Sequence, residues 1–133
     1  MKLRVVTPTR VVVDADVAEI TAPGVVGEFG VLPDHVRFLG ALDAGALTYV
    51  TGAVQRYLIV HGGYVEVDEN TITVLADDAE LPEEIDVELA RRELRKVEEA
   101  LANERHDPVA IARLLREQRQ ARLRVDATAG RST

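Results

Sequence analysis

Residues 64–75 read YVEVDENTITVL, two short apolar runs on either side of an acidic turn. In both runs an apolar residue alternates with a more polar one; the alternating apolar residues are Val65, Val67, Ile72 and Val74. A period of two is typical of a β-strand with one buried face and one wet face. The Asp68-Glu69-Asn70 sequence between the runs is typical of a tight turn. The segment therefore predicts a β-hairpin.

The same rhythm extends back to the start of the chain. Apolar or β-branched runs recur at residues 3–7, 10–13, 17–22, 28–32, 36–42, 46–51, 55–60, 64–67 and 71–75. Turn-forming residues separate them, among them Asp43, Gly45 and the pair Gly62-Gly63. Short strands spaced about 8–12 residues apart are typical of a sandwich or barrel. We therefore predict an all-β domain of antiparallel strands over residues 1–81.

The pattern changes at Pro82, after which glycine is absent until Gly130. Two apolar stripes follow at a helical spacing of three or four residues. The first stripe is Val87, Ala90, Leu94, Val97 and Leu101; the second is Ile111, Leu114, Leu115, Gln118, Ala121 and Val125. Asp86 and Asp107 are predicted N-caps, the latter followed by Pro108 at the first helical position. Two helices joined by so short a loop predict an antiparallel hairpin in a second domain, residues 82–133.

Composition and charge exclude several function classes. The net charge is -7, and residues 1–81 carry five basic and twelve acidic side chains. An acidic domain repels phosphate backbones, so we expect no nucleic-acid partner. The chain has no cysteine, and no run approaches the roughly 20 apolar residues of a membrane helix, so we expect no direct membrane insertion. The N-terminus lacks the apolar stretch of a signal peptide, which predicts that the chain stays where it is made.

The sequence contains no recognisable catalytic constellation. The single serine is Ser132, and no phosphate-binding glycine loop is present. None of the three histidines has a second histidine or a carboxylate at metal-ligand spacing, so we predict no metal site. An acid–base hydrolase using Asp77 and Asp78 has only residue type in its favour. We therefore expect a non-catalytic protein that acts by binding other proteins.

Two glycine-containing segments have both a structural and a functional interpretation. Residues 27–35 read GEFGVLPDH; they form either a strand-turn-strand corner or an exposed loop that presents Glu28 and His35 to a partner. Residues 61–64, HGGY, are interpreted as a glycine corner between two core strands.

Together these two segments resemble the signatures of the epsilon subunit of F-type ATP synthases. The first resembles Gly-Glu-hydrophobic-Gly-hydrophobic-hydrophobic-Pro-x-His, and residues 62–67 with 73–77 resemble the second signature. The resemblance covers residues 3 to about 125. It implies a β-sandwich of about ten strands followed by an antiparallel helical hairpin.

The resemblance also implies a function. It places the chain in the central rotor stalk, which couples proton or other ion flow to rotary ATP synthesis, at the cytoplasmic face of a bacterial plasma membrane. The sandwich would bind the gamma subunit and the membrane ring of c subunits, with Glu28 and His35 in the loop that faces this ring. The helices would fold down on the sandwich or extend along gamma to the catalytic beta subunits, where they inhibit ATP hydrolysis.

The second predicted helix is basic within an acidic protein. It carries Arg113, Arg116, Arg119, Arg122 and Arg124 but a single acidic residue, Glu117, over residues 108–125. One interpretation is that these arginines dock onto the acidic surface that the beta subunits of this family offer. The other is a solvated face whose arginine stems cover apolar surface.

Some members of the family bind ATP through an Ile-Asp-x-x-Arg-Ala motif at the helix pair. Ile85, Asp86 and Ala90 match that motif, but Leu89 stands at the arginine position. Arg91 lies two residues further on, rotated by about 200° around a helix. We therefore expect no bound ATP and no other cofactor; Asp86 is interpreted either as the remaining nucleotide-binding residue of this motif or as a helix cap. A stand-alone ATP-sensing module is the alternative function.

Overall fold

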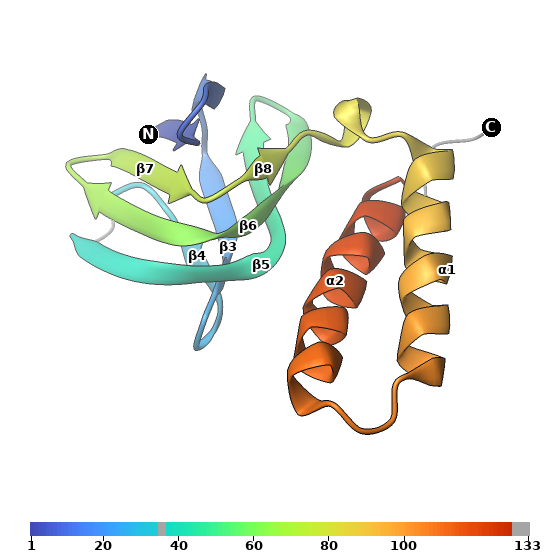
Figure 1. The fold of residues 1–133 in the computed structure, drawn as a ribbon. Helices are drawn as coiled ribbons and strands as arrows, with labels where there is room; N and C mark the ends of the chain where they lie inside the picture. The colour runs from blue at the N-terminus through green and yellow to red at the C-terminus, as the bar shows by residue number, and fades with distance from the viewer. Residues whose placement is uncertain (35–36, 129–133) are drawn as a thin grey trace. The chain divides into compact units, whose positions relative to one another are not determined.

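The computed structural model describes residues 1–34 and 37–128 of the chain. It divides into two compact units, Met1–Leu81 and Pro82–Thr133. The first unit contains β1 (Lys2–Val6), β2 (Val11–Asp16), β3 (Glu19–Gly24), β4 (Gly27–Val31), β5 (Phe38–Thr51), β6 (Val54–Asp68), β7 (Thr71–Ala76) and β8 (Ala79–Glu80). The second contains the short 3-10 helix η1 (Pro82–Glu84) and the helices α1 (Val87–Asn103) and α2 (Pro108–Ala127) (Figure 1).

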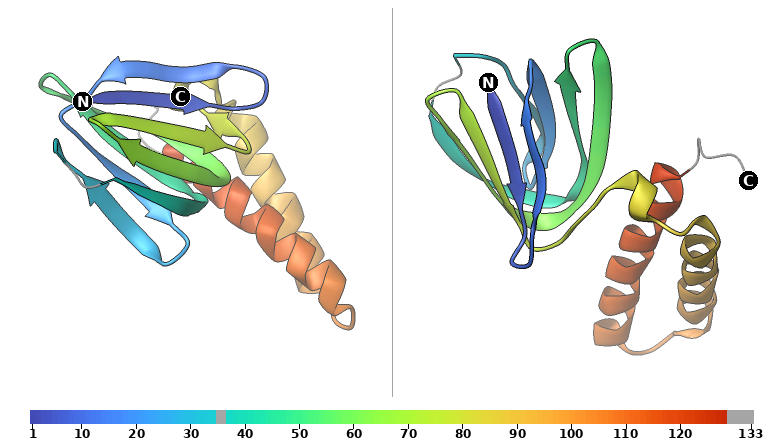
Figure 2. Two further views of the ribbon diagram at one scale, coloured as in Figure 1. Left: turned by 90° about the vertical axis from the view of Figure 1, so that its left-hand side faces the viewer. Right: turned by 90° about the horizontal axis from the view of Figure 1, so that it is seen from above.

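The strands form one mostly antiparallel sheet in the order β2-β1-β7-β6-β5-β3-β4, with β8 also paired to β6. The β1–β7 pair is parallel. The sheet curls so that its two ends face one another (Figure 2). The inward side chains of both halves therefore meet in a single core, which is the arrangement of a β-sandwich.

The sandwich core is built from aliphatic side chains of every long strand. Its fully buried large members include Leu3, Ile20, Leu47, Leu58, Val65, Ile72 and Val74. All four alternating residues of the 64–75 segment are buried, as the period of two predicted. The predicted turn is also confirmed: Glu69 and Asn70 both have positive φ, at 48° and 62°, between β6 and β7. Two residues of positive φ give a two-residue turn whose twist matches that of the flanking strands.

The positions of several other turns were predicted wrongly. Asp43 and Gly45 lie inside β5, and Gly62-Gly63 lies inside β6, so two pairs of expected strands are two long strands. The described residues contain eight strands, including the unexpected β8, where about ten were expected. The reason is that Gly62 and Gly63, with φ of 84° and 127°, bend β6 without ending its pairing. A Cβ on Gly63 would lie 2.8 Å from the Cα of Ala76, so the bend requires glycine at that position.

The helical unit confirms both predicted caps. The Asp86 side chain accepts a hydrogen bond from the Leu89 amide at 3.1 Å. Asp107 accepts from the Val109 and Ala110 amides, at 3.0 and 3.4 Å. The core between the helices is small and consists of Leu94, Val97, Leu114 and Ala121, with Ala100, Leu101 and Val125 partly buried beside them. Leu115, which was predicted on the buried stripe, is instead half exposed.

Candidate partner-binding surfaces

Glu28 lies on an exposed hairpin of the sandwich formed by β3 and β4. It is exposed near the start of β4, opposite Pro23. At the tip of the hairpin, Val25 and Val26 are exposed, and Val26 is 99% accessible. A shallow hollow beside them is lined by Val26, Gly27, Glu28, Phe29, Gly30 and Phe38. Glu28 is therefore on an apolar, accessible edge. The second predicted residue of this surface, His35, lies outside the described residues.

The connection after β4 is tied to a second turn of the sandwich. The Asp34 amide donates a hydrogen bond to Asn70 Oδ1 at 2.9 Å. Arg37 Nε donates to Asp68 Oδ1 at 3.0 Å. Asp34 has a φ of 63°, a turn conformation that aspartate tolerates. Asp34 and Arg37 are thus both anchored to the β6–β7 turn, as the corner interpretation requires, while the presentation of Glu28 and His35 to a partner stays a prediction.

The outer face of the sheet carries an apolar surface that the sequence did not indicate. In register, Ala41 lies opposite Tyr64, Tyr64 opposite Leu75, and Leu75 beside Val6. Leu39 lies two residues before Ala41 and so shares its face. Tyr64, Leu75 and Leu39 are 57%, 55% and 70% exposed. We call Val6, Leu39, Ala41, Tyr64 and Leu75 the outer apolar strip. Its only signal in the sequence is that Tyr64 and Leu75 occupy positions where a wet face would carry polar residues.

The arginines of α2 are not equivalent. Arg122 Nη2 donates to Glu98 Oε1 of α1 at 2.9 Å, and so links the two helices. Arg113 pairs with Glu117 on its own helix at 3.9 Å. Arg119 is also engaged by another group of the chain and is therefore not free. Arg116 is exposed and makes no ion pair within the part of the chain that the structure describes. Part of this basic face therefore stabilises the hairpin, and part of it is available for a partner.

Asp86 has a structural role at the start of α1. Its Oδ1 is engaged with the Leu89 amide, and Leu89 itself is partly exposed. A cap of this kind stabilises the helix without any ligand. This geometry gives no support to the ATP-sensing alternative.

Neither described helix has the length and apolar character needed to span a membrane.

Comparison with known proteins identifies the family. Residues 1–82 match the family described as ATP synthase, delta/epsilon chain, β-sandwich domain. The chain belongs to this family. An ATP synthase epsilon chain of Nitratidesulfovibrio vulgaris (strain DSM 19637 / Miyazaki F) is 47% identical over 92 residues, which are 69% of each chain. One from Anaeromyxobacter sp. (strain Fw109-5) is 39% identical and covers 87% of this chain and 91% of its own.

Solved structures share the fold at low sequence identity. A chain of the Euglena gracilis mitochondrial ATP synthase, in a structure of OSCP, F1 and the c-ring, has a TM-score of 0.75 and 22% identity. It is matched over 91% of this chain and 79% of its own. A chain of the Tetrahymena thermophila mitochondrial ATP synthase central stalk and c-ring has a TM-score of 0.60 and 19% identity, over 96% and 95%. The predicted membership of the ATP synthase epsilon family and the sandwich-plus-hairpin fold are confirmed.

Proposed function

We propose that this chain joins the gamma subunit to the c-ring of a bacterial F-type ATP synthase through its sandwich, and that its helical hairpin inhibits ATP hydrolysis at the catalytic beta subunits. In this role it couples ion flow to ATP synthesis without performing chemistry. It would act at the cytoplasmic face of the plasma membrane as a peripheral part of the complex. The outer apolar strip is the observation that carries this proposal.

The strip is well suited to a permanent protein partner. Soluble monomers rarely expose contiguous apolar patches larger than about a few hundred Å², and larger patches often mark protein–protein interaction sites. The members of the strip come from four neighbouring strands, β5, β6, β7 and β1, so the ladder of the sheet holds their backbones rigidly. A rigid aromatic such as Tyr64 between aliphatic neighbours is typical of an interface anchor. We assign this face to gamma.

The β3–β4 hairpin offers a second surface on the same unit. Its exposed Val25 and Val26 and the adjacent carboxylate of Glu28 combine apolar contact with a single negative charge. This surface is built from a different pair of strands than the strip. We assign it to the c-ring, with His35 as a predicted contributor. A subunit between two partners needs two such surfaces.

The strip can be tested with one charge substitution and a matched control. In Leu75→Asp, a buried charge would have no partner at the interface, so binding to purified gamma should weaken by about 10- to 100-fold. Val54→Asp alters another exposed apolar strand residue, ten residues before Tyr64 on β6, and should bind gamma like the wild type. Circular dichroism would verify the fold of both variants. Wild-type affinity of Leu75→Asp for gamma would contradict the assignment.

The inhibitory role of α2 needs a separate measurement. Replacing Arg113, Arg116, Arg119 and Arg122 together with alanine should raise ATP hydrolysis by the catalytic hexamer with gamma, while gamma binding stays unchanged. Arg56→Ala, a charge removed from the sandwich, is the control. Unchanged hydrolysis would mean that these arginines are only solvated or only hold the hairpin together.

A further inference from the structure

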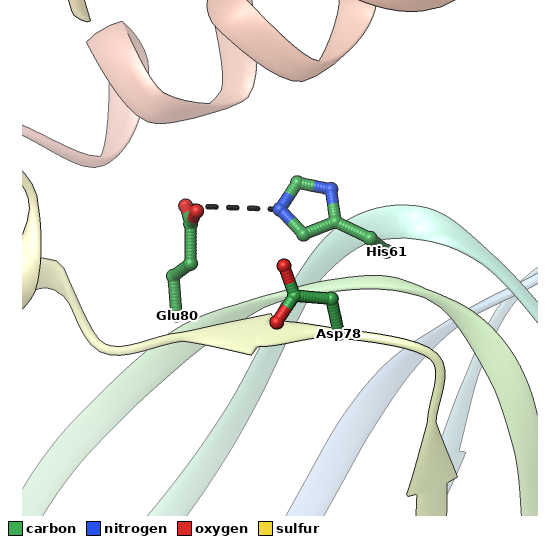
Figure 3. A group of neighbouring side chains, drawn as sticks. All are labelled: His61, Asp78 and Glu80. Atoms are coloured by element: carbon green, nitrogen blue, oxygen red, sulfur yellow. Dashed lines mark ion pairs between the residues drawn. The ribbon is translucent and has the colours of Figure 1, made fainter. Parts of the chain in front are cut away.

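Three ionisable side chains converge at the end of the sandwich where β8 pairs with β6. In that ladder Ile59 lies opposite Glu80 and Val60 opposite Ala79. The His61 amide continues the pairing by donating to the Asp78 carbonyl at 2.9 Å. Figure 3 shows the Glu80 carboxylate pointing toward the imidazole of His61, with the Asp78 carboxylate beside it. The backbone therefore fixes the origin of all three side chains.

The imidazole of His61 is buried without a hydrogen-bond partner. Its side chain is only 6% exposed, and neither ring nitrogen makes a hydrogen bond. Glu80 Oε2 lies 3.7 Å from His61 Nε2, which is too long for a hydrogen bond. Buried polar groups without partners are rare in native proteins, and such a group often marks a binding function or a bound ion. The ring is aimed at two carboxylates that offer negative charge.

The donor set matches a divalent transition metal. One ligand atom from each of His61, Asp78 and Glu80 lies within 4.8 Å of the others. Ligands on a tetrahedral zinc ion at about 2.0–2.1 Å are about 3.3–3.4 Å apart, so small side-chain rotations would close the site. Zinc accepts imidazole nitrogen together with carboxylate oxygen, whereas calcium and magnesium prefer oxygen alone. Three protein ligands leave a fourth position for water.

We propose that His61, Asp78 and Glu80 bind a divalent transition-metal cation of the zinc type. The metal cross-links β8 to β6 one residue before the sandwich unit ends at Leu81. It also offsets part of the negative charge that is concentrated in residues 1–81. This proposal replaces the expectation of no metal site, because the carboxylates lie 17 and 19 residues beyond His61 in sequence and only strand pairing brings them close.

Calorimetric titration of the metal-free full chain with zinc chloride tests the site. We expect one bound zinc per chain, and at least tenfold weaker affinity in His61→Asn and in Glu80→Gln, since even a residue behind a metal ligand is worth about 10- to 100-fold. Asp78→Asn changes an exposed side chain and provides a third ligand variant with little risk to folding. The controls are Asp77→Asn, the neighbouring carboxylate, and His106→Asn, a histidine in the helical unit.

A second readout is thermal unfolding followed by circular dichroism. Zinc should raise the unfolding temperature of the wild type and of both controls, and not that of the ligand variants, because a ligand of the folded state stabilises it. Three results would overturn the proposal: no zinc binding at millimolar concentration, equal binding by the ligand variants, or equal affinity for calcium.

Discussion

The sandwich and the helical hairpin bury their apolar side chains in different ways. The sandwich encloses one continuous aliphatic core to which both halves of the sheet contribute. The hairpin buries four residues between its helices and adds capping hydrogen bonds and the interhelical ion pairs of Arg122 with Glu98 and Arg124 with Glu93. A large core makes a cooperative, rigid unit, whereas a small core leaves an element close to its stability limit. The comparison teaches that one chain can combine a rigid platform with a loosely stabilised arm.

The largest effect should come from a cavity in the sandwich. Ile72 is fully buried in β7, and Ile72→Ala should lower the free energy of unfolding by about 2–5 kcal/mol. Urea unfolding followed by circular dichroism measures this loss. Leu94→Ala in the hairpin is the matched comparison and should leave the free energy of unfolding of the sandwich unchanged. Equal loss of sandwich stability in the two variants would break the contrast between the units.

The next effect concerns the bend in β6. Gly63→Ala forces a side chain into a backbone with a φ of 127° and into contact with Ala76, so strain of about 1–3 kcal/mol is expected. Gly30→Ala is the control, because the new Cβ would lie an ordinary 3.6 Å from the Ile20 carbonyl oxygen. The two midpoints of urea unfolding give the comparison. A Gly63 variant as stable as the Gly30 variant would show that the bend tolerates a side chain.

The hairpin should respond to its caps. Asp107→Ala removes the acceptor for two amides at the start of α2, and should destabilise the helical unit by about 1 kcal/mol. Thermal loss of helical circular dichroism is the measurement. Glu99→Ala, on the exposed face of α1, should leave the melting curve nearly unchanged. If both variants melt like the wild type, capping contributes less than the small core implies.

The smallest effect distinguishes two arginines of α2. Arg122→Ala removes the interhelical pair with Glu98 and should cost up to about 1 kcal/mol, because both partners are partly exposed. Arg116→Ala should not change stability. A double-mutant cycle of Arg122 with Glu98 isolates the pair energy. A coupling energy of zero would mean that Arg122 is only solvated and does not stabilise the hairpin through Glu98. A loss of stability in Arg116→Ala would show that Arg116 has a role within the hairpin.

The sequence was informative about local features and uninformative about surfaces. The alternation around Val65 and Val74, the β6–β7 turn and the caps Asp86 and Asp107 were all predicted, because each depends on residues within a few positions. The outer apolar strip was missed because its members lie on four strands and are adjacent only in register. Glu28 is exposed on the β3–β4 hairpin, and the roles of Glu28 and His35 as partner contacts stay predictions.

The sequence alone determined that an antiparallel β unit precedes two capped helices, since periods of two and of about 3.6 and the capping residues act over single turns and strands. Only the tertiary structure decided that β6 continues through Gly62-Gly63, that Arg122 reaches Glu98, and that His61 meets Asp78 and Glu80. Those outcomes depend on strand register and helix pairing. Both bring together residues far apart in sequence, and no local pattern encodes those distances.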